Sequence, residues 1–292
     1  MQQTLKAPVT FEGVGLHSGR PARLTIRPAS AEHGIWFRRT DITLGDTMIP
    51  ALWHVVEQSP LCTRLINAAG VSVSTVEHVM AALAGCGVHN ALIDIDGPEA
   101  PIMDGSSLPF VKGIMDRGLQ ALTAPVRALE IVAPVEVTVG AATARFEPMD
   151  GMEIDFRIDF PDPAIGAQSR VLNMANGAFV RMLSDSRTFC RKEDIDQMRA
   201  AGLIKGGTLD NAVVVDGAEV LTPGGLRHAD EAVRHKMLDA LGDLALAGGP
   251  IGKILDGDLI AIEIDCHKLR GKIDLVGCDG EEFGAAHGAK AL

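Results

Sequence analysis

The spacing of hydrophobic and polar residues predicts a chain built from short β-strands and a few helices. Residues 152–160 (Met-Glu-Ile-Asp-Phe-Arg-Ile-Asp-Phe) alternate strictly between apolar and polar side chains, which is typical of a strand with one buried face. Turn-forming residues such as glycine and asparagine separate the other apolar runs. These runs predict strands at residues 4–14, 22–28, 34–38, 61–66, 71–73, 90–96, 127–139, 143–147, 211–215 and 219–221.

Longer apolar segments without proline predict helices. The clearest is residues 230–247, which are rich in alanine, leucine and methionine, residues that favour helix. Further helices are predicted from about Ser74 to Gly85–Gly87, from Ser106 or Ser107 to Gly118, and over residues 173–183 and 193–201. The order of elements predicts an α+β fold with two tandem domains of similar topology, residues 1–125 and 126–292. Each domain would be a β-sheet layer with helices, and the two would pack together with the site between them, where ligand pockets tend to lie.

Composition narrows the class of protein. Hydrophobic residues make up 47% of the 292 residues, enough for a substantial core, yet no apolar run approaches the roughly 18 residues of a membrane span. The first residues show no apolar segment of a secretory signal. A net charge of −11, with no basic stripe to offset it, argues against nucleic acid as a partner. The cysteines form no Cys-x-x-Cys pair and predict free thiols in the cytoplasm; they are Cys62, Cys86, Cys190, Cys266 and Cys278.

His235 and Asp239 are four residues apart in the predicted helix 230–247, so their side chains project from the same face. An imidazole and a carboxylate suit a zinc ion, which would need at least one more ligand from elsewhere in the chain. The spacing alone also fits an ordinary surface pair on an exposed helix.

Glu77 and His78 are adjacent near the start of another predicted helix. In one interpretation, Ser74 and Glu77 form a capping box, with Glu77 placed where the helix dipole favours a negative charge. In another, His78 is the third zinc ligand and Glu77 is the general base that takes a proton from water. The two pairs together supply the residues of a catalytic zinc hydrolase with an open fourth position, whereas a structural zinc usually has four protein ligands.

Five motifs carry a resemblance to a known family. They are Gly-Val-Gly-Leu-His-Ser-Gly at residues 13–19, Ser-Thr-Val-Glu-His at 74–78, Pro-Ile-Met-Asp-Gly-Ser at 101–106, Ser-Arg-Thr-Phe at 186–189 and Arg-His-Lys-Met-Leu-Asp at 234–239. In this order, up to about Pro250, the chain resembles the UDP-3-O-acyl-N-acetylglucosamine deacetylases, zinc amidases of lipid A biosynthesis in Gram-negative bacteria. The resemblance implies two α+β domains packed face to face, zinc at their junction and a hydrophobic passage for an acyl chain.

The resemblance also implies roles for individual residues. Glu77 would be the general base, Thr188 would stabilise the oxyanion, Phe189 would line the sugar or acyl site, and Lys236 would approach the polar part of the substrate. From the residues alone, the alternatives are that Thr188 is only a loop hydroxyl and that Lys236 is only a solvated charge. The implied ligands of Zn²⁺ are His78, His235 and Asp239.

The chain departs from the family pattern after Pro250. The family has a Gly-His pair soon after the zinc helix, and its histidine is thought to assist the reaction; residues 250–280 contain no such pair. Residues from about 250 to 280 instead resemble the C-terminal end of dihydroxy-acid and sugar-acid dehydratases, which implies an atypical tail; the stretch 249–266 carries this resemblance. His267 is the histidine near the expected position. It is either a catalytic substitute or a surface histidine at the end of a strand.

The sequence therefore predicts zinc-dependent hydrolysis of the N-acetyl group of UDP-3-O-acyl-N-acetylglucosamine, giving the free amine and acetate, the committed step of lipid A biosynthesis. The alternative is a catalytically impaired protein that still binds zinc and the UDP-sugar, because the Gly-His pair is missing. The expected partner is the UDP-linked acylated amino sugar and not nucleic acid. We expect a cytoplasmic monomer, and the sequence leaves open a transient contact with the inner-membrane surface.

Overall fold

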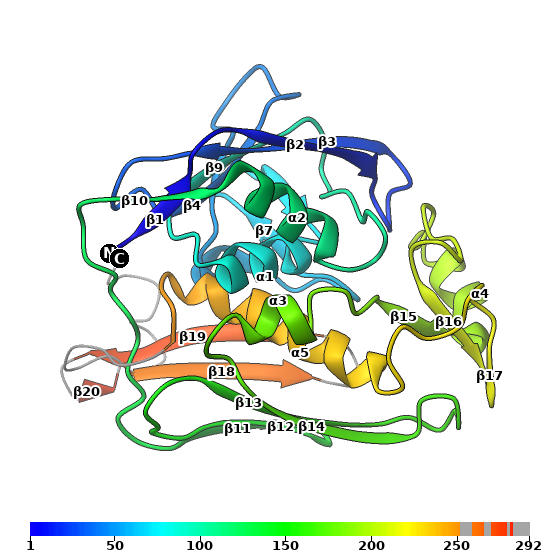
Figure 1. Cartoon of the computed structure of the whole chain (residues 1–292). Coiled ribbons are helices and arrows are strands. Elements are labelled where there is room, and N and C mark those ends of the chain that lie inside the picture. Colours follow the sequence, from blue (N-terminus) through cyan, green and yellow to red (C-terminus); the bar gives the residue numbers. More distant parts are fainter. Residues whose placement is uncertain (252–258, 266–269, 279–280, 283–292) are drawn as a thin grey trace.

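A computed structural model describes residues 1–251 and the backbone of three further segments, 259–265, 270–278 and 281–282. Within these residues, helices lie between layers of β-strands, as Figure 1 shows. This mixture of helices and separate sheets confirms the predicted α+β class.

The first layer is a mixed sheet with strand order β2-β3-β9-β4-β5. Strands β4 and β9 are parallel and the other neighbours are antiparallel. Its strands are β2 Val9–Val14, β3 Pro21–Pro28, β4 Ile35–Arg39, β5 Met48–Pro50 and β9 Ala91–Ile95. Two smaller sheets accompany it: β1 Gln3–Leu5 with β10 Leu119–Ala121, and β6 Val56–Glu57 with β7 Arg64–Ile66 and β8 Ser72–Ser74.

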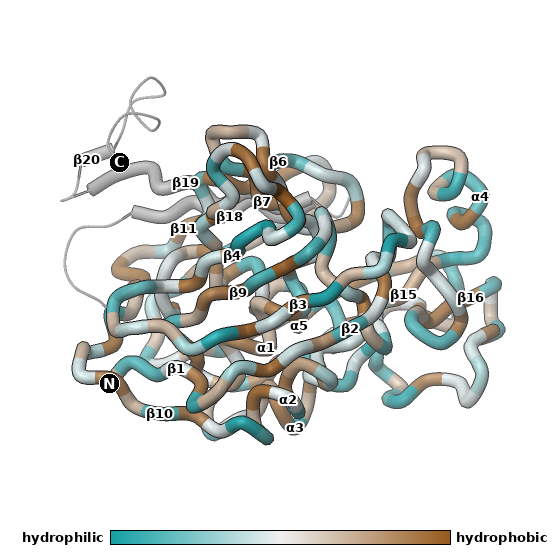
Figure 2. Tube along the Cα trace, turned by 90° about the horizontal axis from the view of Figure 1, so that it is seen from above, coloured by the Kyte–Doolittle hydropathy of each residue, from teal (hydrophilic) through white to brown (hydrophobic). Residues whose placement is uncertain are grey.

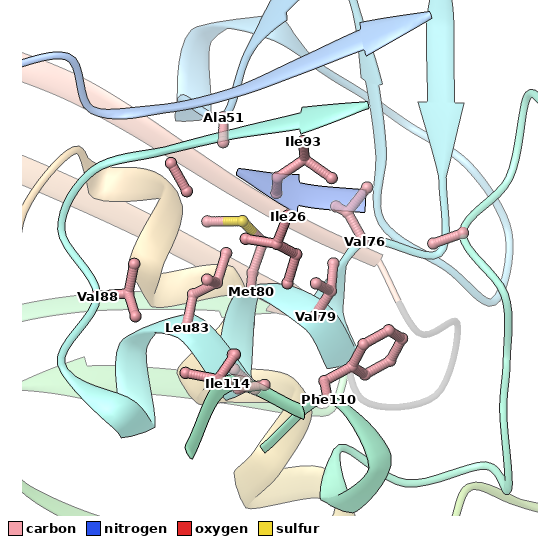
Figure 3. Packing of buried hydrophobic residues seen from close by; sticks show 14 of the residues in the cluster. Ile26, Ala51, Val76, Val79, Met80, Leu83, Val88, Ile93, Phe110 and Ile114 are labelled. Carbon is pink, nitrogen blue, oxygen red and sulfur yellow. The ribbon is translucent and has the colours of Figure 1, made fainter. Parts of the chain in front are cut away.

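The middle layer contains helices, the first and last of which carry the candidate site. They are α1 Glu77–Cys86, α2 Leu108–Arg117, α3 Ala178–Met182 and α5 Glu231–Leu244, with 3₁₀ turns η1 at Trp53–Val55 and η2 at Ala245–Ala247. Figure 3 shows Met80 and Leu83 of α1 between Ile26 and Ile93 of the sheet on one side and Ile114 of α2 on the other. Because α1 buries apolar residues toward both neighbours, it lies inside the core. The same apolar cluster continues into α5.

The second half of the chain supplies the strands on the far side of the helices (Figure 1). Antiparallel pairs are β11 Val135–Val139 with β12 Ala142–Phe146, and β13 Glu153–Asp159 with β14 Ala167–Asn173. The C-terminal strands are β18 Leu259–Asp265, β19 Arg270–Cys278 and β20 Glu281–Glu282. A separate group lies to one side of the other helices in Figure 1, and Figure 2 shows its α4, β15 and β16 from above. It contains α4 Lys192–Ala200, β15 Phe189–Arg191, β16 Val213–Asp216 and β17 Glu219–Val220.

The structure differs from the local predictions in four places. Residues 167–173 form β14 and residues 189–191 form β15, neither of which was predicted. The helix expected over 173–183 is only α3, because Asn173 still pairs with Glu153 in the β13–β14 ladder. The strand expected over 127–139 is likewise confined to Val135–Val139.

The capping-box interpretation of Ser74 and Glu77 is also wrong. The helix α1 begins at Glu77 itself, with Val76 as its N-cap and no capping side chain. Thr75 has a left-handed backbone (φ 58°) and donates a hydrogen bond from Oγ1 to the buried carboxylate of Glu99 (3.0 Å). This turn separates Ser74, the last residue of β8, from the helix. The Glu77 carboxylate accepts a hydrogen bond from the backbone N–H of Thr63 instead (3.1 Å).

Among the described residues, no helix combines the length and the apolar composition needed to cross a membrane. Cys62, Cys86 and Cys190 are free thiols, as predicted. The side chains of Cys266 and Cys278 lie outside the described part of the chain.

Candidate metal centre

Helices α1 and α5 meet at the start of α1, and a glycine makes this contact close. A Cβ atom placed on Gly242 would lie 2.1 Å from the backbone oxygen of Glu77, a separation that real Cβ atoms do not reach. The absence of a side chain at Gly242 therefore lets α5 pack directly against the first residue of α1. This contact places His78 on α1 opposite His235 and Asp239 on α5.

The three predicted ligands come together. The Nε2 atoms of His78 and His235 lie 3.4 and 3.3 Å from Asp239 Oδ1. The two imidazole rings are nearly perpendicular, with centroids 5.0 Å apart, and one ligand atom from each residue lies within 4.8 Å of the others. Both histidines are buried, with 4% and 1% of their surface exposed. The alternative of an exposed surface pair for His235 and Asp239 is therefore wrong.

The state of the ligand atoms fits a zinc ion. His235 Nδ1 lies 3.0 Å from the carbonyl oxygen of Ser186, so Nδ1–H donates to that oxygen and Nε2 keeps its lone pair for a metal. Burial lowers the pKa of His235 to about 4, which leaves the imidazole neutral at neutral pH. Asp239 Oδ1 is buried and has no hydrogen-bond partner among the described residues. A cation would satisfy this oxygen, and nitrogen and carboxylate ligands are those that zinc takes in catalytic sites.

Asp239 stays ionised for a separate reason. Burial opposes its ionisation, but His235, whose imidazole becomes positively charged in acid, and the ammonium of Lys236 outweigh burial and lower the pKa of the Asp239 carboxyl well below its usual range. Lys236 Nζ donates to Asp239 Oδ2 at 3.0 Å and lies 5.5 Å from the centroid of the Phe189 ring. The interpretation of Lys236 as a solvated charge is therefore wrong, since its side chain is only 14% exposed.

Glu77 is buried next to this group of ligands. Its Oε2 accepts a hydrogen bond from the backbone N–H of Thr63 (3.1 Å). The pKa of Glu77 is raised well above its usual value, first by burial and then by the negative charges of Asp239 and Asp243. A carboxylate with a raised pKa accepts a proton more readily, as a general base at neutral pH must.

A cavity of about 1290 Å³ opens beside the candidate metal centre. Glu77, Thr188, Phe189, Lys236 and Asp239 all line it. The backbone of Thr188 is fixed on both sides, because its N–H donates to Gly105 O and its carbonyl accepts from Val213 N–H, each at 2.8 Å. The rest of the wall includes apolar side chains such as those of Phe156, Ile158, Phe160, Met198 and Ile204.

Two residues of the site were missed by sequence reasoning. Asp243 lies one turn beyond Asp239 on α5, is partly buried, and accepts a hydrogen bond from Thr63 Oγ1 at 2.6 Å. Burial and the charge of Asp239 raise its pKa to about 7. Asp243 follows Asp239 by the same four-residue spacing that relates Asp239 to His235, so this spacing could have indicated it. Nothing in the sequence around Thr63 indicates a role in the site. His267, the other predicted catalytic residue, lies outside the described residues.

A buried ion pair joins the segment that carries Thr188 to the start of α5. Glu231 Oε1 accepts from the backbone N–H and from Nε of Arg187 (3.0 and 2.9 Å). Glu231 Oε2 accepts from Arg187 Nη2 and from the backbone N–H of Arg227 (3.1 and 2.7 Å). The side chains of Arg187 and Glu231 are 7% and 1% exposed. Both oxygens of this carboxylate are therefore fully used.

The contribution of Glu231 to stability is expected to depend on pH. Burial raises its pKa, but the bonds from Arg187 and the two backbone N–H groups outweigh burial, so the pKa is lowered. Stability from such a group is fully present above the unfolded value of about 4.3 and is lost as the pH falls through the lower folded-state pKa. Breaking a buried ion pair typically costs about 3–5 kcal/mol. Near pH 7, the free energy of unfolding of Glu231→Gln, measured in urea, should therefore be well below that of the unsubstituted protein. This difference should shrink as the pH is lowered. A difference that does not depend on pH would contradict the prediction.

Two buried histidines, an aspartate and a neighbouring high-pKa carboxylate lie at the edge of a large cavity, and these residue types suit a metal-dependent hydrolase. The sequence matches the LpxC family of UDP-3-O-acyl N-acetylglycosamine deacetylases over residues 2–269. The chain belongs to this family, which confirms the predicted resemblance. The match includes His267 and much of the segment that resembles the dehydratases.

Individual relatives are similar over most of their length. The chain is 48% identical to the UDP-3-O-acyl-N-acetylglucosamine deacetylase of Phenylobacterium zucineum (strain HLK1) over 258 residues, 88% of each protein. It is 48% identical to the enzyme of the same name from Anaeromyxobacter sp. (strain Fw109-5), over 86% of this chain and 81% of that one. The corresponding enzyme of Pasteurella multocida (strain Pm70) is 47% identical over 85% of this chain and 81% of its own.

Proposed function

We propose that this protein is a zinc-dependent deacetylase that removes the N-acetyl group of UDP-3-O-acyl-N-acetylglucosamine, releasing acetate and the free amine for lipid A biosynthesis. Membership of the deacetylase family supports the reaction. The observation that carries the proposal is the convergence of His78, His235 and Asp239 within 4.8 Å, with Glu77 on the same cavity.

The three converging residues would hold the zinc ion. When bound, zinc supplies Lewis acidity that activates water and polarises an amide carbonyl. Glu77 would accept the proton of the attacking water on its carboxylate and pass it to the departing amine. The Thr188 hydroxyl would donate a hydrogen bond to the carbonyl oxygen as negative charge develops there.

The substrate's other parts would lie along the rest of the cavity. The Phe189 ring would form one wall of the sugar or acyl site, and the Lys236 ammonium would approach the polar part of the substrate. The apolar wall that includes Ile158 and Met198 would take the acyl chain, because burying methylene groups is favourable by about 0.8 kcal/mol each. From the sequence alone, we propose His267 as an additional proton donor.

The remaining features are also proposals. We place the boundary between two units of similar topology near residue 125, with residues 126–292 forming the second. We propose that the protein works in the cytoplasm as a monomer. Its partner would be the UDP-linked acylated amino sugar and not nucleic acid. The acyl tail of that substrate is the reason for proposing a transient contact with the inner-membrane surface.

Metal content tests the proposal directly. The purified protein should hold one zinc ion per chain, measured by elemental analysis, because three ligand atoms converge on one position. A strong chelator should abolish release of acetate, and added zinc should restore it. Protein without metal that still deacetylates the substrate contradicts the proposal.

The same assay of acetate release distinguishes an active deacetylase from a catalytically impaired protein. A protein that binds zinc and the UDP-sugar but releases no acetate would support the alternative, for which the missing Gly-His pair is the reason. Assaying His267→Ala beside Glu77→Ala then assigns the role of His267. Activity that survives in His267→Ala and is lost in Glu77→Ala would show that His267 is dispensable.

A further inference from the structure

We propose that the buried pair Arg187–Glu231 is a positioning device for the metal centre, which fixes the Ser186 carbonyl that orients His235 and, with it, the hydroxyl-bearing Thr188. This inference rests on the proposed zinc-dependent function. It concerns two residues that lie outside the ligand set and outside the reacting groups.

The first step is the bond that orients His235. A metal-binding imidazole is held by what its other ring nitrogen donates to, and here the acceptor is the backbone oxygen of Ser186. The Ser186 side chain does not hold that oxygen in place, because its buried Oγ has no hydrogen-bond partner in the described part of the chain. The position of this carbonyl must therefore be set by neighbouring residues.

The second step is the anchoring of the next residue. Arg187 is bound to Glu231 through its backbone N–H, Nε and Nη2, and its Nη2 also donates to Gly225 O at 2.8 Å. Such a two-pronged guanidinium–carboxylate contact fixes direction as well as distance. Since both side chains are buried, water does not compete for these bonds.

The third step is that these contacts form a closed ring, which leaves helix α5 at one residue and returns to it at another. Glu231 and His235 lie four residues apart on α5 and so share one face of the helix. From Glu231 the ring passes to Arg187, along the backbone to Ser186, and through its carbonyl back to His235. A displacement of Arg187 would move the Ser186 carbonyl on one side and pull on Thr188, whose backbone Gly105 and Val213 also hold, on the other. A metal ligand and a group facing the substrate thus depend on the same anchor.

The test compares Arg187→Lys with a matched control, Asp230→Asn. Lysine keeps the charge but not the planar fork. Asp230 is adjacent to Glu231 and pairs with Arg170 and Arg234, each at 2.6 Å, without reaching Ser186 or Thr188. Zinc affinity is measured by chelator competition, ligand geometry by the visible spectrum of the cobalt-substituted protein, and catalysis by kcat and KM for the UDP-sugar.

Arg187→Lys is expected to weaken zinc binding by about 10-fold or more, the usual size of outer-shell effects. It should also change the cobalt spectrum and lower kcat more than it raises KM, while Asp230→Asn changes none of these. If Arg187→Lys does not fold, Glu231→Asp, which keeps both charges of the pair but shortens the carboxylate's reach, carries the same test. Equal zinc affinity in the variant and the unsubstituted protein overturns the inference, as does an equal loss in the control. Failure of the unsubstituted protein to bind zinc refutes the proposed function instead.

Discussion

Replacing Glu77 with glutamine is expected to lower kcat for deacetylation by about 10²–10⁴-fold, the usual contribution of a general base, while the protein still binds one zinc ion. The amide oxygen of glutamine can accept the hydrogen bond that Thr63 N–H now donates to Glu77 Oε2, so the side chain should keep its place. It cannot accept a proton from water. Steady-state kinetics and metal content on the same preparation measure the two effects.

Stability provides an independent check on this variant. Glu77 is a buried carboxyl whose pKa is raised by burial and by Asp239 and Asp243, so an uncharged amide removes an unfavourable charge. Thermal unfolding of metal-free Glu77→Gln should therefore occur at the same or a higher temperature than that of the unsubstituted protein. Loss of zinc together with activity would contradict the assigned role and indicate that Glu77 shapes the metal centre.

A second glutamate controls for the general charge of the cavity. Glu57 also lines the cavity, but it is half-exposed and pairs with Arg64 at 2.9 Å. Glu57→Gln makes the same chemical change away from the ligands and should leave kcat within about twofold, since exposed ion pairs are weak. Equal losses in the two variants would mean that the total charge of the cavity, and not a specific base, controls the rate.

Local geometry explains which parts of the site were predictable. His235 and Asp239 are related by one helical turn, a relation that the sequence specifies once the helix is recognised. Their relation to His78 depends on the packing of α5 against α1, which spacing within either motif does not encode. Ligand chemistry suggested that the two pairs form one zinc site, and the resemblance of five motifs to a family supported this, but neither gave their distance in space. Thr63, which touches both Glu77 and Asp243, could not be found in either way.

The same distinction applies to the fold. Residues 153–159 were recognisable because Ile154 and Ile158 are buried on one face of β13. Its partner β14, Ala-Gln-Ser-Arg-Val-Leu-Asn, buries no residue fully and lacks a clear apolar alternation, so it was missed; pairing with β13 determines its conformation. The apparent capping box failed for a related reason. The left-handed turn at Thr75 depends on Glu99, a residue from a distant loop.

Gly242→Ala is expected to disrupt the metal centre from outside the ligand set. A Cβ on residue 242 would lie 2.1 Å from Glu77 O, 2.8 Å from Glu77 C and 3.0 Å from Glu77 Cα. These are backbone atoms, so no side chain can move aside, and α1 and α5 must separate. Because His78 follows Glu77 directly, the separation draws one ligand away from the other two. We expect a stability loss of about 1–3 kcal/mol from overpacking and zinc affinity at least about 10-fold weaker, measured by urea unfolding and chelator competition.

Gly113→Ala separates the effect on the metal from the effect on stability. Gly113 lies within α2, and its added Cβ would meet side-chain atoms, 2.6 Å from Phe11 Cζ and 3.0 Å from Val9 Cγ2. The substitution also overpacks a helix contact, but one that does not carry a ligand. It should lower stability and leave zinc affinity unchanged. If Gly242→Ala binds zinc as tightly as the unsubstituted protein, the distance between α1 and α5 does not set the ligand geometry. If both alanine variants lose zinc equally, stability alone governs metal binding.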